Sequence, residues 1–196
     1  MTTDQRQIER GRATLLPVLA ICKDERQIVL MTDYSQHGCG FRGQMQAQPG
    51  NTVSLLLGTD HEWQGTVSWN NGRQFGVAHH RDLAFALPAT SGYRSVRSPM
   101  HIPCTVYAGG YSTEAIVENI SLRGLGLRSN IAPGLGTLVS VVIGRTAFET
   151  ATVRWVSGDR FGVRLQSGAD ELVHEVLRAA SRGVTMSMPA KSKVAA

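Results

Sequence analysis

The feature that most constrains the fold of this chain is an internal repeat with a constant offset of 86 residues. Residues 66–77, which carry a Thr-Val-x-Trp segment and then a Phe-Gly-Val segment, recur at residues 152–163. The same offset relates residues 33–40 to residues 119–126, and both segments have the pattern Asp/Asn-x-Ser-x-x-Gly. Such a pattern is expected by chance roughly 0.1 times in a chain of this length. The sequence therefore predicts two copies of one small domain.

Within each copy, apolar and polar residues alternate in short segments separated by Gly, Asn, Asp and Pro. This pattern predicts half-buried strands joined by tight turns, such as those at residues 70–72 and 157–159. Six antiparallel strands close into a small barrel that has no exposed edges. We expect strands at residues 15–21, 27–32, 39–45, 52–57, 62–69 and 75–79 of the first copy, and at 102–107, 113–119, 124–128, 138–143, 147–156 and 160–166 of the second.

After the last strand of the second copy, the apolar period changes from two residues to 3.6. Leu172, Val176 and either Ala179 or Ala180 then share one face, and acidic residues stand in the first turn, where they suit the helix dipole. This segment is predicted to be one helix that ends near Gly183.

The predicted fold class is therefore all-β with a minor helix: two six-stranded antiparallel β-barrels in tandem, with a C-terminal helix after the second. The glycine count of 21 and the aromatic fraction of 6% agree with many short elements. The expected domains are residues 1–88 and 94–184, with a linker at 89–93 and a disordered tail at 185–196.

The positive net charge is compatible with an anionic partner but does not identify it. The formal net charge is +5, and all but three of the 20 Lys and Arg residues are Arg. Arg pairs with phosphate oxygens and guanine edges and stacks on planar rings. A biased genomic base composition explains the same preference equally well.

The cysteines and the N-terminus indicate the compartment. Cys22, Cys39 and Cys104 are odd in number and widely spaced, which favours buried thiols over disulfides or a zinc site. The N-terminus lacks the apolar run of a signal peptide, and no segment has the length of a membrane span. We expect a cytoplasmic protein that does not insert into the membrane.

No catalytic constellation is evident, so we expect that the protein is not an enzyme. Ser35 and His37 are neighbours in one turn and are not placed as a nucleophile and its base. The histidines lack Cys or carboxylate partners at metal-ligand spacing, and there is no Gly-rich phosphate loop. Trp63, Trp69 and Trp155 are interpreted as core or barrel-cap residues.

An arginine cluster precedes each Asp/Asn-x-Ser-x-x-Gly segment and a Trp-turn-Phe-Gly-Val hairpin follows it, so that each copy resembles a PilZ domain. The resemblance covers nearly the whole chain apart from the linker and the tail. It implies a six-stranded barrel that receives the bacterial second messenger cyclic di-GMP through an N-terminal Arg-x-x-x-Arg segment and the Asp/Asn-x-Ser-x-x-Gly turn. The ligand-binding residues that it implies are Arg6, Arg10, Asp33, Ser35 and Gly38 in the first copy, and Arg94, Arg97, Asn119, Ser121 and Gly124 in the second.

The two copies match this pattern unequally. Arg6 and Arg10 have the family's spacing of four, whereas Arg94 and Arg97 are three apart, with Tyr93 where the first arginine belongs. We therefore rank the first copy as the better candidate for cyclic di-GMP binding. The second copy is interpreted as a weaker site, or as one that has lost ligand binding and is retained for packing and dimerisation.

The chemistry of these residues suits a cyclic dinucleotide, which presents two phosphates and two planar guanines. Arg can pair with phosphate, fork onto the O6/N7 edge of guanine and stack on its ring. Asp, Asn and Ser can satisfy polar atoms of a base, and Gly lets the backbone approach the ligand closely. Two arginines on a leader segment can close over a ligand on the barrel wall, so we expect binding to order the leader.

The resemblance implies a cyclic di-GMP receptor that relays the second-messenger level to an unidentified protein partner by conformational change, in motility, surface attachment or exopolysaccharide control. The rival hypothesis is a degenerate, ligand-independent PilZ adaptor in a motility or exopolysaccharide assembly. Non-specific nucleic-acid binding is disfavoured, because the arginines are spread through both copies and the strands lack an aromatic stacking platform. We expect no cofactor, no metal and no DNA partner, and homodimerisation is left open.

Overall fold

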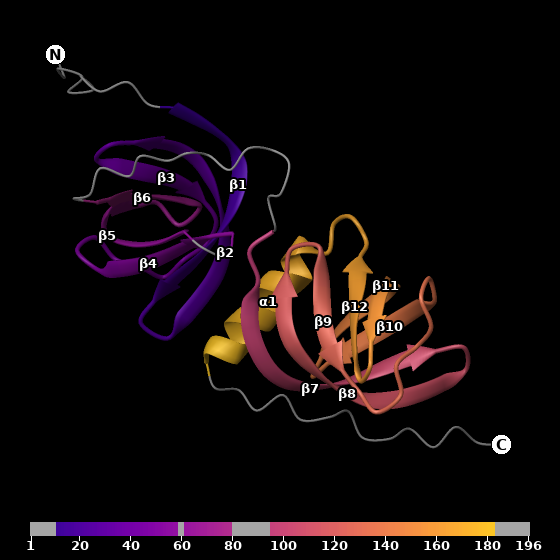
Figure 1. Cartoon of the computed structure of the whole chain (residues 1–196). Helices are drawn as coiled ribbons and strands as arrows, with labels where there is room; N and C mark the ends of the chain where they lie inside the picture. Colours follow the sequence, from indigo (N-terminus) through magenta and orange to yellow (C-terminus); the bar gives the residue numbers. More distant parts are fainter. Residues whose placement is uncertain (1–10, 59–60, 80–94, 183–196) are drawn as a thin grey trace, which may run out of the picture. The chain divides into compact units, whose positions relative to one another are not determined.

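The computed structural model describes residues 11–58, 61–79 and 95–182 (Figure 1). The chain divides into two compact units, Met1–Val96 and Arg97–Ala196. Each unit contains one closed, six-stranded antiparallel barrel, and one helix follows the strands of the second. The predicted fold class is confirmed. The linker and the tail expected from the sequence lie outside the described residues, and the domain boundaries stay a prediction.

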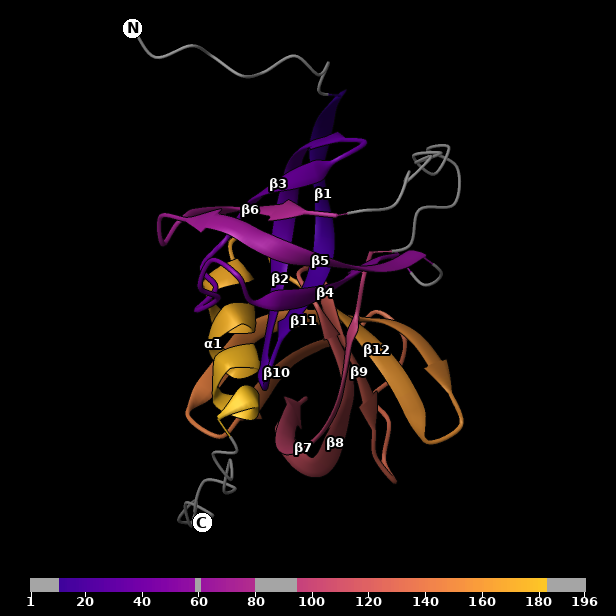
Figure 2. The same ribbon diagram turned by 90° about the vertical axis from the view of Figure 1, so that its left-hand side faces the viewer.

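The first barrel follows the strand order β1-β2-β3-β6-β5-β4 (Figure 2). The predicted strands are all present, and several extend further than the alternation indicated, because pairing with a neighbour continues past the apolar residues. The strand predicted at residues 39–45 is shorter than expected, since β3 ends at Arg42, where its pairing with β2 and β6 stops. The bounds are β1 Gly11–Cys22, β2 Glu25–Ser35, β3 Gly38–Arg42, β4 Thr52–Leu57, β5 His61–Asn70 and β6 Gln74–Ala78.

The second barrel has the same connectivity, with strand order β7-β8-β9-β12-β11-β10. Its bounds are β7 Ser98–Ala108, β8 Tyr111–Ser121, β9 Gly124–Arg128, β10 Leu138–Ile143, β11 Thr146–Ser157 and β12 Arg160–Leu165.

The 86-residue repeat is reproduced bond by bond in the backbone. The His79 amide donates to the carbonyl of His37 at 3.1 Å, and its counterpart Leu165 donates to Arg123 at 3.0 Å. Both barrels also have a β-bulge at the same place in the second strand, just before Asp33 in β2 and Asn119 in β8. Further equivalent pairs are Gly43 to Arg73 and Ser129 to Asp159, Gly50 to Val67 and Gly136 to Val153, and Val67 to Asn51 and Val153 to Thr137.

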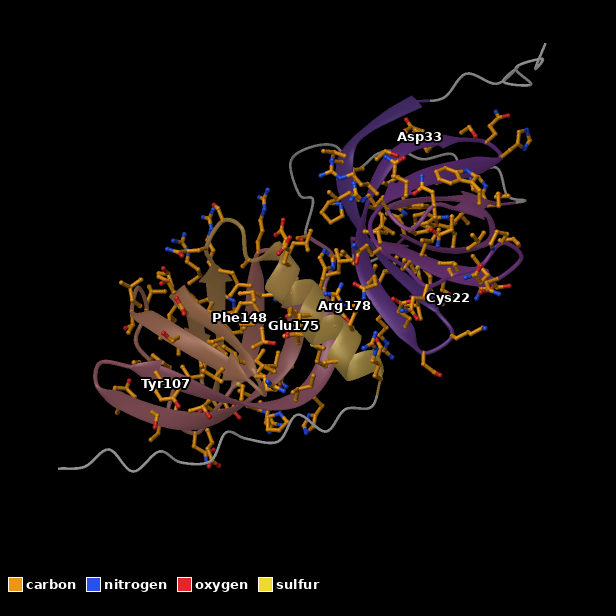
Figure 3. The ribbon with its side chains drawn as sticks, turned by 180° about the vertical axis from the view of Figure 1, so that it is seen from behind. Cys22, Asp33, Tyr107, Phe148, Glu175 and Arg178 are labelled. Atoms are coloured by element: carbon orange, nitrogen blue, oxygen red, sulfur yellow. The ribbon has the colours of Figure 1, made fainter. Side chains whose placement is uncertain are left out.

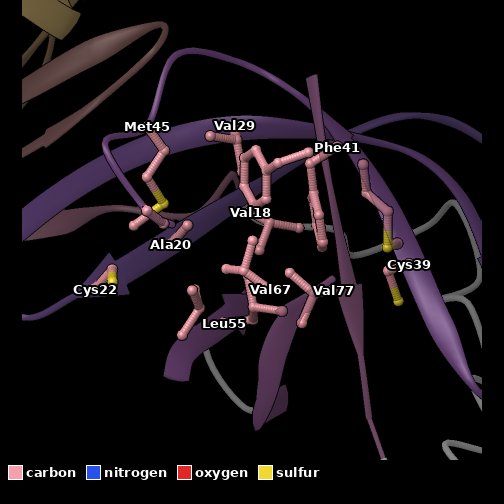
Figure 4. Packing of buried hydrophobic residues seen from close by; sticks show 14 of the residues in the cluster. Val18, Ala20, Cys22, Val29, Cys39, Phe41, Met45, Leu55, Val67 and Val77 are labelled. Atoms are coloured by element: carbon pink, nitrogen blue, oxygen red, sulfur yellow. The ribbon is translucent and has the colours of Figure 1, made fainter. Parts of the chain in front are cut away.

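Alternation along the strands places one set of apolar side chains inside each barrel. Figure 4 shows this core in the first barrel. In the first barrel, Phe41 and Phe75 stack with their ring centroids 5.1 Å apart and are almost completely buried. Burying a side chain of this size contributes roughly 1.5–3 kcal/mol to folding. Cys22, Cys39 and Cys104 form no disulfide and are buried, as predicted.

Helix α1 (Asp170–Ser181) begins with two acidic residues and contacts β11 (Figure 3). Its buried residues are Val173, Val176 and Leu177. Val176 was predicted on the apolar face, whereas Leu172, Ala179 and Ala180 are only partly buried, so the buried face includes Val173 and Leu177 in their place. Glu175 and Arg178 are labelled on this helix in Figure 3. Across the described ranges, no helix combines the length and hydropathy needed to cross a membrane.

Candidate functional site

The Ser and Gly of the Asp/Asn-x-Ser-x-x-Gly pattern shape the hairpins β2–β3 and β8–β9. The Ser35 hydroxyl donates to the Gly38 carbonyl at 3.3 Å, and that of Ser121 donates to the Gly124 carbonyl at 3.1 Å. A Cβ on Gly124 would lie 2.5 Å from the backbone oxygen of Val163, so this position requires Gly. Both residue types therefore have a structural role, as local turn devices commonly do.

The Asp or Asn of the pattern lies at the end of the second strand, just past the bulge. A Cβ built on Gly126 would lie 2.5 Å from the Asn119 Nδ2 atom, and a Cβ on Gly40 would collide with the Asp33 carboxylate. Each polar side chain thus lies flat over a glycine of the third strand. Asp33 is labelled on the first barrel in Figure 3.

These residues belong to a row that crosses four strands of each barrel. In the second barrel, Asn119 pairs with Gly126, Gly126 with Gly162, and Gly162 with Trp155. Directly paired residues on antiparallel strands present their side chains on the same face. The row therefore places an amide, a floor of two glycines and an indole side by side over roughly 14 Å.

The first barrel has the same row, with Asp33 at one end and Trp69 at the other. Two glycines, Gly40 and Gly76, form its floor. We call this arrangement the glycine floor of each barrel.

The position of two tryptophans corrects the sequence analysis. Trp63 is buried, as predicted, but Trp69 is 43% exposed and Trp155 is 39% exposed. Each indole lies against the second floor glycine, where a Cβ on Gly76 or Gly162 would collide with it. Their interpretation as core or cap residues is wrong, and the outer wall does contain an aromatic surface on which a planar base can stack. The available signal was the Phe-Gly-Val segment after each Trp, since the Gly leaves room for the indole.

Strand pairing brings the second arginine cluster to the motif. The first residues of β7 pair with the end of β8 at Pro99 and Asn119, and Arg97 lies just before β7. Its Nη1 atom donates a hydrogen bond to the Asn119 Oδ1 atom at 3.1 Å. Arg6, Arg10 and Arg94 lie outside the described residues.

Cations surround the glycine floor more densely in the second barrel. Arg164 pairs with Gly124 on one side of the floor, and Arg128 pairs with Arg160 on the other. The corresponding residues in the first barrel are Ala78 beside Gly38, and Arg42 beside Gln74.

The positions beside the floor of the second barrel therefore hold four arginines, Arg97, Arg128, Arg160 and Arg164, and Glu118 pairs with two of them. The first barrel offers Arg42 against Asp33 at the same positions. An anionic ligand is attracted more strongly to the second wall.

Within residues 11–58, 61–79 and 95–182, other reactive groups do not form a second centre. Burial raises the pKa of the Cys104 thiol to about 12, so this thiol stays protonated and is a poor nucleophile. Among the described residues, no cluster of three or more His, Cys, Asp or Glu side chains has a geometry that holds a metal ion.

Comparison with known families identifies one of the two copies. Residues 93–182 match the PilZ domain family. The match spans the second barrel and α1, and it includes Arg94, Arg97 and the motif from Asn119 to Gly124. No curated protein matches the chain.

Solved structures resemble the chain only distantly. The PlzA protein of Borreliella burgdorferi in complex with c-di-GMP is 7% identical, with a TM-score of 0.37 over 82% of this chain and 86% of that one. The MrkH–c-di-GMP complex of K. pneumonia is 10% identical, with a TM-score of 0.39 over 86% and 88%. YcgR of Escherichia coli in complex with c-di-GMP is 13% identical, with a TM-score of 0.36 over 86% and 85%. At these identities and scores, no site or ligand is transferred to this chain.

Proposed function

We propose that the protein is a cyclic di-GMP receptor and that its principal site is the outer wall of the second barrel. The observation that carries this proposal is the hydrogen bond from Arg97 to Asn119 above the glycine floor, with an exposed Trp155 at the other end of the row. The match of residues 93–182 to the PilZ domain supports the same ligand class.

Each part of this wall suits one part of a cyclic dinucleotide. The Arg97 guanidinium can pair with a phosphate or fork onto a guanine edge. The Asn119 amide offers both a donor and acceptors to the base. The exposed indole of Trp155 offers a face for stacking, worth roughly 1–3 kcal/mol per base. The two floor glycines make room for these side chains, because the Asn119 amide lies over Gly126 and the Trp155 indole lies over Gly162. A flat ligand on this wall would therefore contact the amide and the indole.

The first barrel is proposed as an additional site with the same geometry. Its described wall carries fewer arginines beside the floor than that of the second barrel, so Arg6 and Arg10 must supply the positive charge. These two arginines have the spacing of four for which the sequence favoured this copy. Asp33 can accept hydrogen bonds from a guanine, but its charge opposes a nearby phosphate.

We propose that the bound state is relayed to a protein partner, with the ordering of the arginine leader as the change that the partner detects. The adaptor hypothesis remains the second candidate, and one observation favours it. The second barrel has a groove of about 530 Å³ whose lining includes Tyr107, Tyr111 and Leu138, all of which are exposed. Tyr107 is labelled on this barrel in Figure 3. Exposed aromatic and aliphatic side chains of this kind are typical of protein interfaces.

Calorimetric titration with cyclic di-GMP at physiological salt, with GTP as the control ligand, tests the proposal. Two double variants assign the site: Arg97→Ala/Asn119→Ala for the second barrel and Arg6→Ala/Arg10→Ala for the first. We expect micromolar or tighter binding that is selective over GTP and is lost mainly in the second-barrel variant.

Loss in the first-barrel variant alone would make the first copy the receptor. No binding of cyclic di-GMP by the wild-type protein would refute the receptor function, and the groove at Tyr107 would then be the surface to test for protein partners.

A further inference from the structure

The second barrel carries a three-residue ionic cluster next to its glycine floor. The Glu118 Oε1 atom accepts a hydrogen bond from the Arg160 Nη2 atom at 3.3 Å. In the ion pairs, the Glu118 Oε2 atom lies 3.2 Å from the Arg160 Nε atom, and the Oε1 atom lies 3.1 Å from the Arg128 Nε atom. The side chains are 59%, 42% and 24% exposed for Arg160, Arg128 and Glu118. We call these residues the Glu118 cluster.

The strand register fixes where this cluster lies. Arg128 follows Gly126 by two residues on β9, and Arg160 precedes Gly162 by two residues on β12. Arg128 and Arg160 pair directly with each other, so both side chains share the outer face with the floor. Glu118 is the bulged residue immediately before Asn119. On β9 and β12 the cluster therefore lies two residues away from the row over which the proposed ligand binds.

The first barrel lacks this cluster although its backbone is equivalent. Thr32 stands at the position of Glu118 and donates to the Asp33 Oδ2 atom at 3.0 Å. Arg42 occupies the position of Arg128, and Gln74 that of Arg160. The barrel fold therefore requires neither the carboxylate nor the second guanidinium.

Stability does not account for the cluster either. Ion pairs between exposed side chains typically contribute only about 0–1 kcal/mol. The ordering of two long arginine side chains offsets much of that gain. A function that uses two guanidinium groups in a fixed position explains the cluster better than a contribution to folding.

We infer that Arg128 and Arg160 are the phosphate-binding residues of the second barrel and that Glu118 is a resident counter-ion, which a ligand phosphate displaces in part. The inference rests on the proposed function and adds two ligand contacts outside the Arg-x-x-x-Arg and Asp/Asn-x-Ser-x-x-Gly patterns. Among the described residues, the guanidinium of Arg128 has its ion pair with Glu118 and no hydrogen bond to its Nη atoms. A phosphate can accept from several guanidinium N–H groups at once, and such charge-assisted bonds are about twice as strong as neutral ones.

Three single variants test the inference by titration with cyclic di-GMP. Arg160→Gln introduces the residue of the first copy and should weaken binding about tenfold, the loss typical of one charge-assisted hydrogen bond. Glu118→Gln removes the competing charge and should tighten binding several-fold. Arg145→Gln is the control: this exposed residue lies in the β10–β11 turn, on the order of 30 Å along β11 from Trp155, and removes the same charge.

Each outcome decides the inference. Wild-type affinity in Arg160→Gln, together with lost binding in Arg97→Ala/Asn119→Ala, would overturn it and leave the receptor function intact. An equal loss in Arg160→Gln and Arg145→Gln would overturn it as well, since net charge alone would then explain the effect. Unchanged or weaker binding in Glu118→Gln would refute the counter-ion role. A wild-type protein that binds no cyclic di-GMP would overturn the receptor function and this inference together. Thermal melting of each variant confirms that the barrels stay folded.

Discussion

Adding a single methyl group to the glycine floor should weaken ligand binding and leave the stability of the fold nearly unchanged. In Gly126→Ala, the new Cβ would lie 2.5 Å from the Asn119 Nδ2 atom and 2.8 Å from its Oδ1 atom, closer than real contacts allow. The backbone of Gly126 is compatible with Ala, since its φ is not in the left-handed region. The Asn119 amide must therefore swing away, and Arg97 then loses its acceptor at 3.1 Å.

The expected loss of affinity follows from the bonds that the displaced amide makes. Two hydrogen bonds, one to the leader arginine and one to the base, contribute about 0.5–1.5 kcal/mol each. The combined 1–3 kcal/mol corresponds to roughly 5–150-fold weaker binding of cyclic di-GMP. Stability should change by less than about 1 kcal/mol, because the amide moves on the outer wall and leaves the core intact.

Titration and thermal melting of the same samples provide the two readouts. Gly134→Ala is the matched control, since its Cβ would have no neighbour closer than 3.6 Å. Gly40→Ala applies the same methyl to the first barrel, under Asp33. Wild-type affinity in Gly126→Ala would refute the role of Asn119, and lost binding in Gly40→Ala alone would move the site to the first barrel.

Three further predictions concern stability. Gly124→Ala should cost about 1–3 kcal/mol and lower the melting temperature, because its Cβ meets the rigid backbone oxygen of Val163 at 2.5 Å; an unchanged melting curve would contradict this. Phe41→Ala, which removes the stacking partner of Phe75, should cost about 3–5 kcal/mol in chemical denaturation, and a loss below 1 kcal/mol would show that the core is not packed as described. Burial lowers the pKa of His174 below its usual value of 6.5, so the unfolded chain binds the proton more readily and stability falls as the pH drops below about 6.5. Melting curves at about pH 7.5 and pH 5.5 should therefore differ more for the wild-type protein than for His174→Gln, and equal differences would refute this assignment.

The repeat and the alternation of apolar residues were sufficient to predict the architecture. Both signals have a direct physical cause, because a barrel strand must direct every second side chain inward and a duplicated domain repeats the same turns. Strand ends were predicted less well: β1 begins at Gly11 and β8 ends at Ser121, beyond the predicted ends, since pairing between neighbouring strands continues there. The family match over residues 93–182 supports the resemblance stated from the sequence for the second copy.

The outer wall was harder to predict, because its geometry depends on β-bulges. A bulge shifts the side chains that follow it by one position, so alternation counted from the sequence assigns them to the wrong face. Trp69 and Trp155 follow such register shifts in β5 and β11, which is why they lie on the wall rather than in the core. The Glu118 cluster depends on the same effect in β8 and on long-range pairing between β9 and β12.

The two copies also separate the residues that the fold requires from those that carry ligand chemistry. The floor glycines and the tryptophan are identical in both barrels, and each indole packs on its glycine. This pair is needed to build the wall whether or not a ligand binds, so its presence alone does not identify a receptor. The residues beside the floor differ between the copies. Arg164 stands where the first barrel has Ala78, and Arg160 stands where it has Gln74. Ligand preference must therefore reside in these flanking charges, and exchanging them between the copies should move cyclic di-GMP affinity from one barrel to the other while both barrels stay folded.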